Sequence, residues 1–205
     1  MNYSDRIYGI FLNENERNGI DIRKRESPMC LAVANRIINR TNAHNRVRAG
    51  LKQPAIPMNG KRLQKILYLC QLEWIAEGHK DYLISDDFEA WVKGPVVSSI
   101  YNIFSIYQDG GMLPYQTKDV NALSEEERCV INKIVDNTIG IDTDTIVAFT
   151  HTPGGPWDQV YNNEDKRVQR PVIPKETIRK YMSSEKSRKQ LQIFITKGVL
   201  PDECR

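Results

Sequence analysis

Apolar residues recur every three or four positions in several segments of the 205-residue chain, which is the spacing of amphipathic helices. A first helix follows Ser27-Pro28, a typical N-cap and first-turn proline, and is predicted to end near residues 40–42. Residues 61–78, KRLQKILYLCQLEWIAEG, are apolar over a broader surface, so this helix is expected at the centre of the core. Shorter helices are predicted at 96–107, 125–139, 143–150 and 174–182.

A two-residue period replaces the helical spacing at 88–93, FEAWVK, and is typical of a short strand. Gly94-Pro95 is predicted to end this strand and to open the helix that follows. Residues 167–174, RVQRPVIP, look extended and are predicted to pair with 88–92. The expected fold is therefore mainly α, a compact helical domain of about six helices with a small two-stranded β element.

Three pieces differ from this helical pattern. Residues 1–26 are polar and weakly periodic, and we expect a polar N-terminal arm there. Residues 42–58 contain one glycine and two prolines and are predicted to form a long basic loop inside a helical domain that spans 27–182. Residues 183–205 are predicted to be a charged C-terminal segment with an amphipathic pattern.

The net charge of +3 conceals an uneven distribution. Residues 1–72 carry 13 Lys/Arg and 5 Asp/Glu, whereas residues 73–144 carry 5 and 14. No acidic residue lies between Glu26 and Glu73. Such a basic block is suited to nucleic acid or to an acidic protein, although folding against the acidic middle of the chain is an equally open alternative.

No strong catalytic, cofactor or metal motif is present, and we predict a protein that is not an enzyme and has no cofactor. The three histidines lie far apart, without the spacing of metal ligands. Asp87 and Glu89 share a strand face and are the nearest approach to a carboxylate pair, but an acidic strand edge is the commoner role. His151 precedes a Pro-Gly-Gly-Pro-Trp loop, for which a rigid turn that buries Trp157 is favoured over chemistry.

Features of export and membrane insertion are also missing from the pattern. No apolar run approaches the roughly 20 residues that span a bilayer, and residues 1–19 do not resemble a secretory signal. Cys30, Cys70 and Cys129 each lie among apolar residues at helical spacing, where a reduced thiol acts as a small hydrophobe. We therefore expect a cytoplasmic protein without a membrane partner.

Three segments together resemble the Panacea domain family of SocA-like antitoxins. Leu63-Gln64-Lys65 with Leu67-Tyr68 is similar to the first motif of that family, and Glu89-Ala90-Trp91 followed by Gly94-Pro95-Val96-Val97 is similar to the second. The third is a threonine, Thr152, shortly before Pro156-Trp157. The resemblance covers roughly residues 28–182. The motif residues are interpreted mainly as scaffold, with Leu63, Leu67, Tyr68, Trp91 and Trp157 in the packing and Gly94 and Pro95 in a turn.

The resemblance implies an antitoxin of a bacterial or prophage toxin–antitoxin system, which binds a cognate protein toxin and, in the SocA branch, delivers it to a Clp-type protease. The family carries no enzymatic activity. The basic loop 42–58 departs from the short link usual in the family, so we expect the partner-binding surface there and at the start of the next helix. Its predicted residues are Arg46, Arg48, Lys52, Lys61, Arg62 and Lys65.

Two alternatives remain beside toxin binding. The same basic residues would suit nucleic acid and autoregulation, but no convincing helix-turn-helix is visible, so weak or no nucleic-acid binding is expected. A less favoured alternative is an enzyme built on His151 and the carboxylates at 86–89.

Overall fold

The computed structural model describes residues 28–107, 111–115, 123–162 and 169–202. Its helices and strands, in chain order, are α2 (Pro28–Gly50), α3 (Gly60–Ala76), β1 (Phe88–Trp91), β2 (Gly94–Val96), α4 (Ser98–Phe104), α5 (Glu125–Thr138), α6 (Thr143–Thr150), α7 (Pro156–Tyr161), β3 (Val172–Ile173), α8 (Lys175–Ser183) and α9 (Glu185–Lys197). The prediction of a mainly helical fold with a small β element is confirmed. The predicted arm 1–26 lies outside the described residues.

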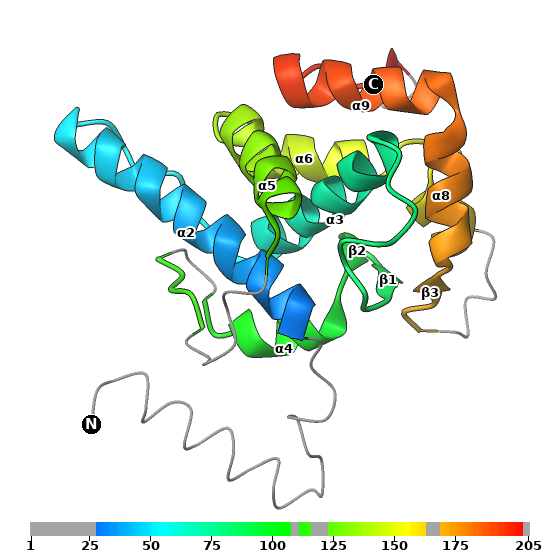
Figure 1. Cartoon of the computed structure of the whole chain (residues 1–205), viewed down its shortest axis with the longest axis horizontal. Helices are drawn as coiled ribbons and strands as arrows, with labels where there is room; N and C mark the ends of the chain where they lie inside the picture. Colours follow the sequence, from blue (N-terminus) through cyan, green and yellow to red (C-terminus); the bar gives the residue numbers. More distant parts are fainter. Residues whose placement is uncertain (1–27, 108–110, 116–122, 163–168, 203–205) are drawn as a thin grey trace, which may run out of the picture.

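Helix α3 is the centre of the molecule, as its apolar pattern predicts. Every residue from Arg62 to Ile75 is buried. It contacts α2, α4, α5, α6, α8, α9 and β2, with α2 and α5 on one side and α8 and α9 on the other (Figure 1). Asn59 caps the helix by accepting a hydrogen bond from the Arg62 amide at 2.9 Å. Burial on all sides explains why polar residues of α3 must find partners inside the protein.

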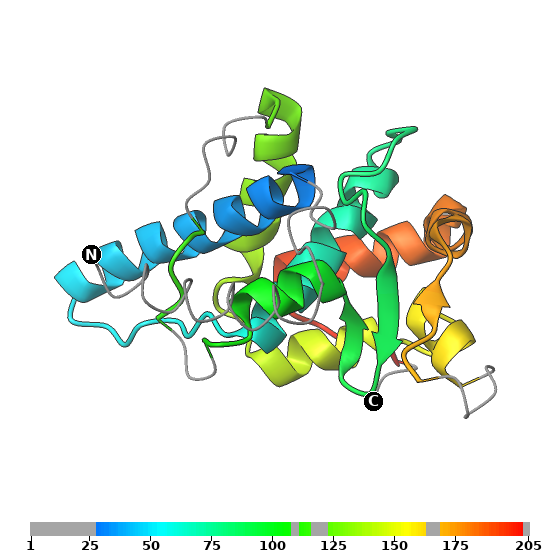
Figure 2. The ribbon, with the colours of Figure 1, turned by 90° about the horizontal axis from the view of Figure 1, so that it is seen from below.

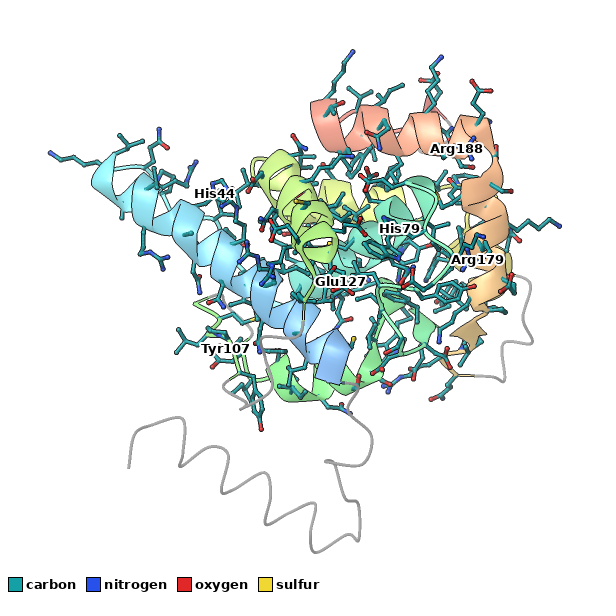
Figure 3. The ribbon with its side chains drawn as sticks, viewed as in Figure 1. His44, His79, Tyr107, Glu127, Arg179 and Arg188 are labelled. Carbon is teal, nitrogen blue, oxygen red and sulfur yellow. The ribbon has the colours of Figure 1, made fainter. Side chains whose placement is uncertain are left out.

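Helix α2 is longer than predicted, because it continues through residues 42–50 to Gly50. Tertiary contacts stabilise the extra turns. The carboxylate of Asp136 on α5 accepts hydrogen bonds from Arg40 at 2.6 Å and His44 at 2.7 Å (His44 is labelled in Figure 3). The Asn45 side chain pairs with the backbone N–H and C=O of Ile56, at 2.7 and 2.9 Å. The irregular segment between α2 and α3 is thereby reduced to residues 51–59.

The sheet has three strands in the order β2-β1-β3, all antiparallel. The predicted pairing of the segment around Val172 with β1 is confirmed, with Phe88 opposite Ile173. The prediction for Gly94-Pro95 was wrong, because these residues form a second strand that pairs back onto β1 and α4 begins only at Ser98. Residues 88–96 are thus a β-hairpin with Val92 and Lys93 as its turn.

Helices α8 and α9 belong to the same core as α3. Leu191, Phe194 and Ile195 of α9 are fully buried, and Phe194 stacks on Phe149 at 4.1 Å. Arg179 of α8 donates to the carbonyl of His79, which follows α3, at 3.3 Å (Figure 3). The predicted C-terminal segment therefore contributes to the core through α9. None of the helices in the described ranges is long and apolar enough to cross a membrane.

Candidate functional site

The six basic residues predicted to form one partner-binding surface fall into two groups. Arg46, Arg48 and Lys52 lie at the end of α2, which projects away from the helical body (Figures 1 and 2). Arg46 and Lys52 are exposed and Arg48 is partly exposed. Between them Val47 and Leu51 are 65% and 64% exposed. We call these five residues the α2 tip, a basic surface that also presents two apolar side chains.

Backbone hydrogen bonds hold the α2 tip. The left-handed position after the helix, where glycine is usual, is occupied by a basic residue. Lys52 has φ of +56°, in the left-handed region. The chain turns there, with the Gln53 amide donating to the Arg48 carbonyl at 2.9 Å. A non-glycine residue in this conformation costs about 1–2 kcal/mol. Neither Arg46 nor Lys52 has a carboxylate partner within the part of the chain that the structure describes.

Arg62 and Lys65 correct the predicted surface, because both are buried, with 2% and 1% of their surface exposed. Arg62 donates to the carbonyls of Thr138 and Ile141, at 2.8 and 2.7 Å, and so caps the C-terminal end of α5. Burial lowers the pKa of its guanidinium. Lys61 stays partly exposed, but its ammonium pairs with Asp144 at 2.7 Å. The start of α3 therefore offers little free positive charge.

Lys65 and Gln64 instead support the hairpin from the core, through hydrogen bonds to its backbone. The Lys65 ammonium donates to the Pro95 carbonyl at 2.6 Å. Burial, followed by the neighbouring charge of Lys61, lowers the pKa of Lys65 to about 7. The Gln64 amide accepts from the Val97 N–H at 2.8 Å and donates to the Val97 carbonyl at 3.4 Å. These bonds satisfy backbone groups at the outer edge of β2, which no strand of the described residues covers.

The first turn of α7, together with the loop before it, holds the other strand of the hairpin. Trp157, which is 6% exposed, donates its indole N–H to the Trp91 carbonyl at 2.8 Å. Thr152 fixes the loop by donating its hydroxyl to the Phe149 carbonyl at 2.6 Å. Side chains from the first and third sequence motifs thus meet on the backbone of the second. The first and third motifs thus support the β-hairpin that the second motif forms.

The packing roles predicted for the motif residues hold with one exception. Leu63, Leu67 and Tyr68 lie in the hydrophobic core. Trp91 was predicted there too, but its side chain lies on the outer face of β1 and is only partly buried. The alternation of the strand contains this signal, because Phe88 and Ala90 face inward and Trp91 must then face outward. The predicted role of Trp91 as a core residue was therefore wrong.

His151, Asp87 and Glu89 are each held by separate contacts. His151 ends α6 and stacks on Trp157, with ring centres 3.8 Å apart. Asp87 pairs with Lys175 at 3.3 Å. Glu89 accepts the indole N–H of Trp91 at 2.7 Å. Each of these groups thus has a structural contact of its own, and none of these contacts joins His151 to Asp87 or Glu89.

Stability is expected to decline with acid in part because of His151. Burial, then the charge of Lys65, lowers the pKa of this imidazole to about 4. The unfolded chain therefore takes up the proton first, and the loss of stability develops as pH falls from about 6.5 to 4. After allowance for the partial exposure of the ring, this loss amounts to roughly 1–2 kcal/mol.

The prediction is tested with urea unfolding at pH 7 and pH 4.5. His151→Phe keeps a ring against Trp157 and removes the titrating group, so its stability is expected to change less between the two pH values. His44→Phe is the matched control at a partly exposed histidine, which pairs with Asp136 at 2.7 Å. Equal acid sensitivity of wild type and His151→Phe would show that His151 does not contribute.

Comparison with known proteins finds a family match that includes the β-hairpin and does not include the α2 tip. Residues 63–158 match the family described as antitoxin SocA-like, Panacea domain, a range that begins within α3 and encloses all three motifs. This range is shorter than the residues 28–182 expected from the motifs. Arg46, Arg48 and Lys52 lie before it, and Arg170 lies after it.

The chain is also similar to Antitoxin SocA of Caulobacter vibrioides (strain NA1000 / CB15N), with 27% identity over 123 residues. The similarity covers 52% of this chain and 62% of the antitoxin, less than two thirds of that relative's length. No solved structure matches the chain significantly. The resemblance predicted from the motifs is thus confirmed, because residues 63–158 match the Panacea domain of SocA-like antitoxins and the chain is similar to one such antitoxin.

Proposed function

We propose that this protein is an antitoxin that neutralises a cognate protein toxin by direct, stoichiometric binding. The match of residues 63–158 to the SocA-like Panacea domain carries the proposal. The interior of that domain supports a binding role rather than a catalytic one, because its buried polar residues Gln64, Lys65 and Trp157 are engaged with the hairpin backbone. Delivery of the bound toxin to a Clp-type protease is proposed as the step that follows binding.

The α2 tip is proposed as the surface that first meets the toxin. It projects from the body and carries cations without carboxylate partners in the described chain. It also lies outside the matched domain, where features particular to this chain are expected. An acidic surface on the toxin would complement it, and such complementarity raises the rate of association more than the final affinity. Val47 and Leu51 add apolar area between the charges.

Reversing the charge of the α2 tip is expected to slow toxin binding. The variant Arg46→Glu/Arg48→Glu/Lys52→Glu removes the attraction, so the association rate constant should fall at least about tenfold at low salt, and less at high salt. Stability should change little, by less than about 0.5 kcal/mol at each exposed site. Co-expression with the product of the neighbouring gene measures protection, and surface plasmon resonance with the purified toxin measures the rates.

The matched control carries the same change of net charge elsewhere. Lys180→Glu/Lys189→Glu/Lys197→Glu alters three exposed lysines of α8 and α9 and should leave association nearly unchanged. Equal slowing in both triple variants would mean that net charge, and not the α2 tip, attracts the toxin. Toxin abundance during co-expression separates simple binding, which leaves the toxin present, from proteolytic delivery, which shortens its lifetime.

Nucleic acid is the alternative partner for the same residues. A basic helix end is expected to retain DNA only weakly at physiological salt, since few phosphates are neutralised. Tight, sequence-selective DNA binding that is lost in the α2 tip variant would favour autoregulation over toxin binding. Fluorescence anisotropy with a labelled fragment of the promoter region provides this measurement.

A further inference from the structure

A second exposed surface lies at the tip of the β-hairpin. Its turn residues Val92 and Lys93 are exposed, and Val92 has 70% of its surface accessible. Two-residue hairpin turns are usually formed by glycine, asparagine or aspartate, so turn geometry does not require a valine here. Beside the turn lie Trp91, partly buried, and Tyr101 of α4, 38% exposed. With Arg170, which precedes β3, we call these five residues the hairpin surface.

The aromatic part of the hairpin surface is fixed by its neighbours. The guanidinium carbon of Arg170 lies 3.9 Å from the centre of the Trp91 ring, and the Tyr101 ring centre lies 4.8 Å away. The indole N–H is held by the Glu89 carboxylate at 2.7 Å. Such a ring loses little side-chain entropy when a partner packs on it, which favours binding. Tryptophan, tyrosine and arginine are also the residues most enriched at binding hot spots.

The backbone beneath these side chains is equally constrained. Lys65, Gln64 and Trp157 donate to or accept from the backbone of residues 91–97, and all three are buried. The buried groups of the domain therefore position a hairpin whose own tip remains exposed. This arrangement presents a rigid surface, and rigid presentation lowers the entropic cost of binding.

Arg170 supplies an independent indication that this surface has a role. Its φ of +59° makes it, with Lys52, one of two non-glycine residues in the left-handed region among the described residues. Glycine would adopt this conformation at lower cost. Strained residues of this kind concentrate at binding sites, where the side chain justifies the strain. Here the strained backbone places a guanidinium on Trp91.

The charges of the hairpin surface indicate the chemistry of its partner. Neither Lys93 nor Arg170 has a carboxylate partner in the described ranges, and the carboxylate of Glu89 already accepts the Trp91 N–H. The surface thus combines apolar and aromatic side chains with two cations that have no carboxylate partner among the described residues. Its complement is an apolar protein segment flanked by carboxylates.

We propose that the hairpin surface is a second contact site of this protein and that its occupant is an apolar, acid-flanked segment of the toxin. The inference rests on the proposed antitoxin function. It adds the surface on this protein that keeps the toxin bound after association. The α2 tip and the hairpin lie in separate parts of the molecule (Figures 1 and 2). Exposed charge at the α2 tip governs association, whereas packed aromatic and arginine anchors govern dissociation.

Variants of the hairpin surface are therefore expected to speed dissociation. Val92→Glu places a carboxylate in the apolar contact. Arg170→Gly removes the cation and also removes the backbone strain at this position, because glycine adopts the left-handed conformation at lower cost. Each should raise the dissociation rate constant about 10- to 100-fold, with the association rate constant changed less than about threefold. Val199→Glu, at an exposed valine beyond α9, is the matched control and should match wild type. Surface plasmon resonance with the purified toxin measures both constants.

A second measurement locates the contact without mutation. Hydroxyl-radical labelling of Trp91 and Tyr101 should decrease in the toxin complex. Labelling of Tyr82, whose hydroxyl donates to Glu176 of α8, should stay constant. If wild type binds the toxin but the two variants bind equally well and the labelling is unchanged, the hairpin inference is wrong and the antitoxin function stands. If wild type neither binds nor protects against the toxin, the proposed function itself is wrong.

Discussion

Gly94→Ala is expected to lower the free energy of unfolding by about 2–5 kcal/mol, from a left-handed backbone cost of about 1–2 and an overpacking cost of about 1–3. Gly94 has φ of +92°, and an added Cβ would lie 2.6 Å from the Thr150 hydroxyl and 2.9 Å from the Lys65 ammonium. Neither neighbour can withdraw easily, because Thr150 donates to the Val147 carbonyl and Lys65 donates to the Pro95 carbonyl.

Gly78→Ala separates the two parts of this effect. Gly78 has a similar φ of +95°, but no atom lies within 4 Å of the position that its Cβ would take. The control should therefore lose only the backbone share, about 1–2 kcal/mol. Urea unfolding of both variants gives the comparison. Equal losses would mean that the close approach of the hairpin to α3 and α6 is unimportant, and that the bracing of the hairpin is looser than these contacts indicate.

The sequence predicts those elements whose stability is local or whose pattern is unambiguous. Helix α3 follows from its apolar positions, and the pairing of β3 with β1 follows from two extended segments. The last turns of α2 were missed because they depend on Asp136 and Ile56, which lie far along the chain or across a turn from their partners. A pattern of basic residues with few apolar ones does not reveal such contacts.

The interaction surfaces were predicted only in part for the same reason. Arg46, Arg48 and Lys52 are visible as a basic block, and the structure places them at the exposed end of α2. Arg170 reaches Trp91 only because β3 pairs with β1, so no sequence spacing joins them. Tyr101 likewise meets Trp91 through the placement of α4. Alternation along β1 was the one local signal, since it turns Trp91 outward.

Arg62 shows how charge can mislead a sequence-based prediction of a surface. Its neighbours Leu63, Ile66 and Leu67 are core residues, and a charged residue within such a run is buried when it has acceptors to meet. The acceptors are the carbonyl of Thr138, the last residue of α5, and the carbonyl of Ile141 just beyond it. The fork of the guanidinium serves several at once, with longer contacts to the Ile139 carbonyl and the Thr143 hydroxyl, both at 3.4 Å.

Arg62→Met is accordingly expected to lower the free energy of unfolding by about 2–4 kcal/mol. The Ile141 carbonyl loses a donor at about 1–3 kcal/mol, and the Thr138 carbonyl, which keeps the Ile141 amide as a donor, loses one of two hydrogen bonds at about 1 kcal/mol. Arg62→Lys keeps the charge but offers a single ammonium in place of the planar guanidinium. Its free energy of unfolding should therefore lie between those of wild type and Arg62→Met. Thermal and urea unfolding measure both variants. Toxin binding by the folded fraction of Arg62→Met should equal that of wild type, because the side chain is 2% exposed and cannot touch a partner. A stable Arg62→Met protein that fails to bind the toxin would instead return Arg62 to the interaction surface, and would require α5 to move away from α3 in the complex.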